Sequence, residues 1–213
     1  MRVFPPSGAP DRRGTPPWPC ALFGALILLL SGPAQALPVQ WDAGSGGNDH
    51  FYEVVLLPSE ITWQAARTDA QARGGDLASI TSTAENAFVF GLADDPSFWT
   101  LAGPHNYGPW IGGFQSVFTS EPAGGWEWAD GEAWSFTAWA SGQPDNNGGA
   151  EHHALYFVPA NARSATWNDW TGGGLLVKSY VFESTVPEPS LGALLGLGLA
   201  VGAWKRNRGA ARP

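Results

Sequence analysis

Cysteine is almost absent from this chain of 213 residues: only Cys20 is present, close to the N-terminus. The rest of the sequence therefore cannot contain a disulfide framework, a thiolate metal site or a cysteine nucleophile. Charged residues are also scarce, at 14% of the total, and no internal repeat is visible. Because 44% of the residues are hydrophobic, the composition also excludes a disordered chain.

Basic residues are rare between residues 37 and 187, where four stand against seventeen acidic residues, a formal charge of −13. The four are Arg67, Arg73, Arg163 and Lys178. A segment this acidic repels phosphate backbones and anionic lipid, which argues against nucleic-acid binding. Hard cations and neutral sugars are compatible partners, and solubility alone is the simpler explanation of the charge.

Tryptophan and glycine are abundant, with 12 and 28 residues, which favours short strands and many turns. Residues 51–55 predict a strand, and residues 60–73 place small and apolar side chains at helical spacing before Gly74-Gly75. A capping box over residues 82–85 predicts a second helix. From Trp110 onward, short strands alternate with turns. Two helices followed by strands predict an α+β domain.

The first 36 residues have the parts of a secretory signal peptide. Arginines precede an apolar run over residues 20–30, and Ala34-Gln35-Ala36 follows it. The run is too short to span a bilayer comfortably, and the small-x-small pattern is what signal peptidase cleaves. We therefore expect export, with cleavage after Ala36 and a linker over residues 37–48.

The C-terminal segment, residues 185–213, combines three features in order: the tripeptide Pro187-Glu188-Pro189, an apolar helix over 191–204 and a basic tail. This order resembles the PEP-CTERM sorting signal of Gram-negative bacteria that make extracellular polysaccharide. The resemblance implies transient insertion in the inner membrane with the basic tail cytoplasmic. It also implies cleavage near the tripeptide by a membrane sorting enzyme, which leaves the domain at the cell surface or in the extracellular matrix. A plain membrane anchor is the alternative.

Several segments of the central region resemble C-type lectin domains, in the order that this family has. The matching segments are residues 63–80, 110–113, 126–131, 139–145, 167–169 and 180–183. The resemblance implies a C-type lectin-like domain over residues 49–184, with two helices, two small antiparallel sheets and a long loop region.

This sequence departs from the family at its cysteine positions. The resemblance puts Ala70 and Phe182 where one disulfide would lie, and His153 and Gly172 where the other would lie. Losing a disulfide costs roughly 2–5 kcal/mol in a small secreted domain, so we expect the tryptophan-rich core to compensate. Residues 94–109 are longer than the usual family connection, and the sequence suggests no function for them.

Side-chain oxygens crowd into residues 143–151 and 168–169. In sugar-binding members of the family, the five matching positions surround one calcium ion, a cation that prefers six to eight oxygen ligands. The five residues here are Gln143, Asp145, Glu151, Asn168 and Asp169. The resemblance implies that they bind one calcium ion together with two adjacent sugar hydroxyls, and that the peptide bond before Pro144 is cis. A plain polar turn is the alternative.

We expect one ion rather than two, because Asn146 and His152 stand where acids would help to bind a second. Within the family a Gln-Pro-Asp loop goes with galactose-like ligands, so a galactose-type lectin for surface or extracellular polysaccharide is predicted. Trp170 is the candidate aromatic platform for the sugar, and packing in the core is an equal alternative for it. The competing function is a protein-binding or structural matrix component without a sugar ligand.

An enzyme is not expected. His152 and His153 would point to opposite faces of a strand, so they cannot easily share a metal ion. Glu127, Asp130 and Glu132 could form a carboxylate pair of the glycosidase type, but solvated acids at a hairpin are the preferred interpretation.

Overall fold

The computed structural model describes residues 37–173 and 177–186 of the chain. The predicted signal peptide over residues 1–36, the Pro187-Glu188-Pro189 tripeptide and the apolar stretch 191–204 lie outside the described residues. Within the described part, no helix has the length and apolar character that crossing a bilayer requires.

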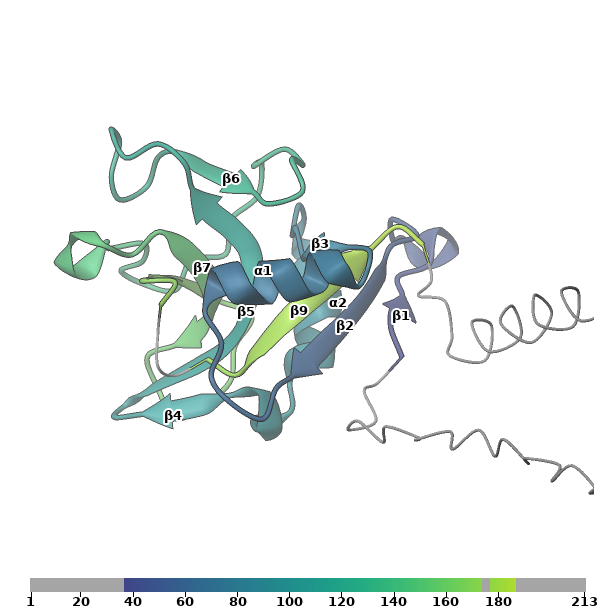
Figure 1. The fold of residues 1–213 in the computed structure, drawn as a ribbon, viewed down its shortest axis with the longest axis horizontal. Helices are drawn as coiled ribbons and strands as arrows, with labels where there is room; N and C mark the ends of the chain where they lie inside the picture. The colour runs from purple at the N-terminus through teal and green to yellow at the C-terminus, as the bar shows by residue number, and fades with distance from the viewer. Residues whose placement is uncertain (1–36, 174–176, 187–213) are drawn as a thin grey trace, which may run out of the picture. The chain divides into compact units, whose positions relative to one another are not determined.

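The described residues form two α-helices, three short 3-10 helices and nine strands (Figure 1). The helices are α1 (Trp63–Ala72), α2 (Thr83–Ala93), η1 (Ala43–Ser45), η2 (Pro96–Phe98) and η3 (Asn147–Gly149). The strands are β1 (Val39–Gln40), β2 (Phe51–Leu56), β3 (Asp76–Leu77), β4 (Thr100–Ala102), β5 (His105–Gln115), β6 (Trp126–Trp128), β7 (His153–Val158), β8 (Trp167–Trp170) and β9 (Ser179–Ser184). The predicted α+β class is confirmed.

Both α-helices begin at a side-chain cap. The Thr62 hydroxyl accepts a hydrogen bond from Ala65 N at 3.2 Å, and the Ser82 hydroxyl accepts one from Glu85 N at 3.1 Å. Each hydroxyl satisfies one of the backbone donors that a helix start leaves free. The predicted capping box is only half formed, because the Glu85 carboxylate bonds to Thr81 instead of reaching back to Ser82 N.

The strands form one connected sheet in the order β1-β2-β9-β5-β7-β8. Strand β3 pairs with β9, while β4 and β6 pair with β5. All pairs are antiparallel except β5 with β9, which is parallel. The resemblance implied two small antiparallel sheets. They are joined because Trp110 in the long strand β5 pairs with Tyr180 in β9, a contact between residues far apart in the sequence.

Each face of the central strands carries one helix, because neighbouring residues of a strand point to opposite faces. In β9, Val181 belongs to the buried cluster that includes residues of α2, whereas Tyr180 and Phe182 belong to the cluster that includes residues of α1. Figure 1 shows α1 crossing in front of β9 with α2 behind β2. The strands are therefore covered on both sides.

Two segments contain secondary structure that the sequence did not predict. The predicted linker 37–48 contains β1, in which Val39 pairs with Tyr52 of β2, and Trp41 stacks on Phe88 at 5.6 Å between ring centroids. The long connection 94–109 forms η2 and a hairpin of β4 with the start of β5. The partners of these added strands are β2 and β5. A strand edge has unpaired backbone N–H and C=O groups, which favours the addition of another strand.

The residues at the expected cysteine positions are packed without disulfides. Ala70 and Phe182 are both fully buried in the cluster beside α1. His153 lies against Gly172 so closely that a Cβ on that glycine would be 2.4 Å from the His153 Nδ1 atom. The His153 imidazole and Gly172 thus fill, by packing alone, the space that the second disulfide would occupy.

Candidate functional site

The five predicted calcium ligands come from two segments. Gln143, Asp145 and Glu151 belong to the loop that leads into β7, and Asn168 and Asp169 are neighbours in β8. Strands β7 and β8 are antiparallel partners, with Ala154 opposite Asp169. The pairing therefore brings the end of the loop beside the two β8 residues.

Three carboxylates meet at this place. Asp145, Glu151 and Asp169 each offer one oxygen atom, and these oxygens all lie within 4.8 Å of one another. Asp169 is fully buried and Glu151 is 3% exposed, whereas Asp145 faces solvent. Three carboxylates at this spacing repel one another unless a cation or a proton lies among them.

The two amides have unused acceptors. Gln143 Oε1 and Asn168 Oδ1 are buried, and neither accepts a hydrogen bond from any of the residues that the structure describes. A buried polar atom without a partner costs about 1–3 kcal/mol, so such atoms are rare unless a ligand uses them. Five oxygen-bearing side chains, of which three are acidic, are the donors that a hard cation such as calcium prefers. The residues therefore fit the ion.

Backbone donors hold the loop around Asp169. Its carboxylate accepts hydrogen bonds from Asp145 N at 3.1 Å and from Asn146 N at 2.7 Å. Asn147 N donates to Asp145 Oδ1 at 3.2 Å and to Glu151 Oε2 at 2.9 Å. The peptide bond between Gln143 and Pro144 is cis, as the resemblance implied. The carboxylates are thus positioned by protein groups alone.

The pKa values reflect the crowding of acids. Burial, together with the nearby charges of Asp169 and Asp145, raises the pKa of Glu151 to about 7, although the Asn147 N–H opposes the shift. Burial also raises the pKa of Asp169, against the N–H groups of Asn146 and Asp145, which lower it. Each of the two carboxylates is therefore more stable when a cation binds beside it than when it carries its negative charge without one.

Asn146 is a residue whose contribution the sequence did not reveal. The sequence marked it only as a position where an acid would help to bind a second ion, yet its backbone adopts φ +46° and its side-chain oxygen accepts a hydrogen bond from Glu151 N at 3.1 Å. Asparagine tolerates this left-handed conformation better than most residues.

Trp170, the proposed sugar platform, is half-buried. Its ring packs against Tyr107, with 4.8 Å between centroids, and its indole nitrogen is buried without a partner among the described residues. Two other tryptophans, Trp126 and Trp128, belong to the core and are 5% and 2% exposed.

The two histidines have separate surroundings. His152 Nδ1 lies 3.1 Å from Gln115 Oε1, and the His153 ring packs on Trp63 with 4.8 Å between centroids. Burial lowers the pKa of His153 to about 4.

Of the acids near β6, Glu127 and Asp130 are exposed as expected, but Glu132 is half-buried. It faces His50 and Glu183, a group of possible metal ligands that the sequence did not predict. The three lie far apart in the sequence and follow no motif, so only the tertiary structure reveals them.

Comparison with known proteins gives two family matches. Residues 59–173, more than half of the chain, match the Lectin C-type domain, and residues 185–208 match the PEP-CTERM protein-sorting motif. The chain is 35% identical over 109 residues to the galactose-specific lectin nattectin of Thalassophryne nattereri, covering 51% of this chain and 60% of nattectin. It is 31% identical over 152 residues to a perlucin-like protein of Mytilus galloprovincialis, covering 70% and 85% of the two chains.

Among solved structures, the C-type lectin CEL-I of Cucumaria echinata superposes with a TM-score of 0.48 at 26% identity, covering 64% of this chain and 90% of CEL-I. The sequence match to the family decides the classification, and the two helices and the mixed sheet agree with it. This chain belongs to the C-type lectin domain family and carries a PEP-CTERM sorting motif at its C-terminus.

Proposed function

We propose that this protein is an exported, calcium-dependent lectin whose loop before β7 and strand β8 bind one calcium ion and a sugar. The proposed ligands are Gln143, Asp145, Glu151, Asn168 and Asp169. One observation supports this most strongly: three carboxylate oxygens converge within 4.8 Å, and the two amides of the same set have buried oxygens without a partner in the described part of the chain. Family membership agrees, because C-type lectin domains usually bind calcium and are generally not enzymes.

The side chains would have different roles in binding. Asp169 holds the loop by accepting two backbone hydrogen bonds, and the exposed Asp145 is the carboxylate most open to a ligand from solvent. Calcium, when bound, would offer open coordination positions to two adjacent hydroxyls of a sugar ring. The carboxylates accept hydrogen bonds from those hydroxyls, and the amide NH₂ groups of Gln143 and Asn168 donate to them.

A galactose-type preference is the more specific part of the proposal. It is supported by the order Gln143-Pro144-Asp145 and by the similarity to nattectin, which is named as galactose-specific. Exchanging amide and carboxylate at these positions exchanges hydrogen-bond donors and acceptors, so a different pair of hydroxyls is matched.

The double variant Gln143→Glu with Asp145→Asn should therefore move binding from galactose toward mannose. Competition of the two free sugars for an immobilised glycan, at saturating calcium, measures this shift. A wild-type protein that prefers mannose would show that the loop rule does not apply here.

A glycan array with and without a calcium chelator tests the function as a whole. We expect binding to one class of glycan in calcium and none in chelator, with Asp169→Asn inactive in both. Binding that survives chelation would contradict the calcium-dependent mechanism.

A second candidate function is a protein-binding or structural matrix component, in which calcium only stabilises the fold. The observation that favours it is Trp170, whose ring is packed on Tyr107 and so offers only part of its surface to a sugar. An array without any bound glycan, combined with a calcium-dependent rise in melting temperature, would decide for this candidate.

The sorting motif implies sorting during export. The location proposed from it is the cell surface or the extracellular matrix, after a membrane sorting enzyme has acted near Pro187-Glu188-Pro189. A polysaccharide of that surface would be the natural ligand.

A further inference from the structure

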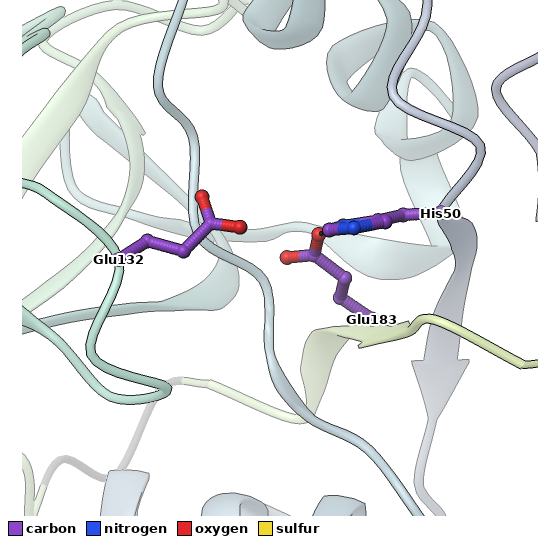
Figure 2. A group of neighbouring side chains, drawn as sticks. All are labelled: His50, Glu132 and Glu183. Carbon is purple, nitrogen blue, oxygen red and sulfur yellow. Dashed lines mark hydrogen bonds and ion pairs between the residues drawn. The ribbon is translucent and has the colours of Figure 1, made fainter. Parts of the chain in front are cut away.

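A second group of side chains converges at a different place from the predicted calcium ligands (Figure 2). His50 lies directly before β2, Glu183 belongs to β9, and Glu132 follows β6. One ligand atom from each lies within 4.8 Å of the others, and His50 Nδ1 is 2.5 Å from Glu183 Oε1. Figure 2 shows the Glu132 carboxylate directed toward the other two side chains.

The Glu183 carboxylate is fixed in position by hydrogen bonds. Glu183 is only 5% exposed; Oε2 accepts a hydrogen bond from Ser79 N at 2.8 Å, and Oε1 lies 2.9 Å from Tyr52 Oη. The antiparallel pairing of β2 with β9 sets Tyr52 opposite Glu183, which also places His50 near it. The imidazole and this carboxylate are therefore preorganised by the sheet.

Glu132 differs, because its carboxylate accepts no hydrogen bond from any residue in the described ranges. Only its backbone is tied down, through Glu132 N donating to Asp130 Oδ1 at 3.0 Å. Burial, together with the charges of Glu183 and Asp130, raises the pKa of Glu132 to about 7. A half-buried acid that points at another acid without a donor of its own is stabilised by a proton or by a cation that binds beside it.

The surroundings supply little positive charge. The three side chains open into a cavity of about 440 Å³. Four of its lining residues are acidic, and no lysine or arginine is among the described residues that line it. Asp76 is neutralised by Arg67 at 3.1 Å, which leaves three acids against the single imidazole. The lining residues are His50, Gly74, Gly75, Asp76, Asp130, Glu132, Glu183, Ser184 and Thr185.

We infer that His50, Glu132 and Glu183 bind a second cation, a transition-metal dication of the zinc type. The imidazole nitrogen decides the class of metal, because calcium takes oxygen ligands whereas zinc accepts nitrogen and carboxylate oxygen together. Three protein ligands leave the fourth position of a tetrahedral ion open toward the cavity. In place of the proton between His50 and Glu183, the ion would cross-link three distant chain segments in a domain without disulfides.

Zinc titration of the full chain in saturating calcium, followed by calorimetry, tests this inference. We expect one zinc equivalent to bind, and cobalt in its place to give visible absorption bands of tetrahedral intensity. Glu132→Gln should weaken zinc binding by at least roughly tenfold, since even an indirect partner of a metal ligand is worth about 10–100-fold. His50→Gln should weaken binding similarly.

Matched controls separate this site from others. His152→Gln removes another half-exposed imidazole, and Asp145→Asn disrupts the calcium ligands; both should leave zinc binding unchanged. Because the Glu132 carboxylate makes no hydrogen bond in the described chain, Glu132→Gln should fold, which circular dichroism checks. Should Glu132→Gln fail to fold, the zinc anomalous signal in a crystal of the wild type locates the ion instead.

Absence of a zinc equivalent would overturn the inference, as would equal affinity in wild type, Glu132→Gln and His50→Gln. Loss of zinc binding in His152→Gln would do the same. None of these outcomes bears on the proposed calcium site, because calcium is kept saturating throughout.

Discussion

Replacing Asp145 by asparagine should remove most of the stability that calcium gives to this protein. Asp145 is the exposed member of the three-carboxylate group, and Asn147 N is the donor hydrogen-bonded to its carboxylate, at 3.2 Å. Asn is nearly the same size as Asp, so the variant changes the charge of one ligand and disturbs the fold little. Wild type and variant should therefore differ mainly in their response to calcium.

The size of the effect follows from the geometry. Two unit charges 4.8 Å apart repel by about 3.5 kcal/mol at an effective dielectric constant of about 20, and the three carboxylate oxygens lie within that distance. A cation among them relieves this repulsion in the native state only. At a free calcium concentration a hundred times the Kd, binding stabilises the fold by about 2.7 kcal/mol. For a domain of this size that is a rise in Tm of roughly 8 °C.

Differential scanning calorimetry of the full chain, in excess calcium and in chelator, measures the difference. We expect the rise in wild type and in Glu60→Gln, a control that removes one exposed acid elsewhere, and little or none in Asp145→Asn. In chelator the variant should melt at or slightly above the wild-type temperature, because one repelling charge is gone. A wild-type melting curve that does not respond to chelator would refute the site, and so would an undiminished rise in Asp145→Asn.

Two further predictions concern the packing and the tail. Gly172→Ala should destabilise the protein by about 2–4 kcal/mol, measured by urea unfolding, because φ is +68° and the new Cβ would lie 2.4 Å from His153 Nδ1. Gly173→Ala, whose new Cβ meets no atom of the described residues within 4 Å, should change stability by less than about 0.5 kcal/mol, and equal effects would contradict this account. Glu188→Gln should leave the full-length protein in the membrane fraction of a host with the sorting enzyme; if it fractionates like wild type, the segment acts as a plain anchor.

The sequence alone was enough for the helices, the order of the segments and the loop that carries the predicted ligands. Local chemistry determines these features: Thr62 and Ser82 cap helices from their own positions, and Gly74, at φ +91°, ends one. The set from Gln143 to Asp169 could be named because its members stand in two short stretches with a recognisable spacing. The oxygens of its three carboxylates required only the pairing of β7 with β8 to meet.

The tertiary structure alone decided how distant segments pair. That β5 and β9 join the strands into one sheet, or that residues 39–40 add a strand to β2, depends on backbone pairing between segments with no shared motif. The same holds for His50, Glu132 and Glu183, which are separated by 82 and 51 positions; the sequence drew attention only to Glu132, as an acid at a hairpin, and gave no reason to group the three. Burial and charge at such a group arise from all the elements packed around it, so no local pattern contains them.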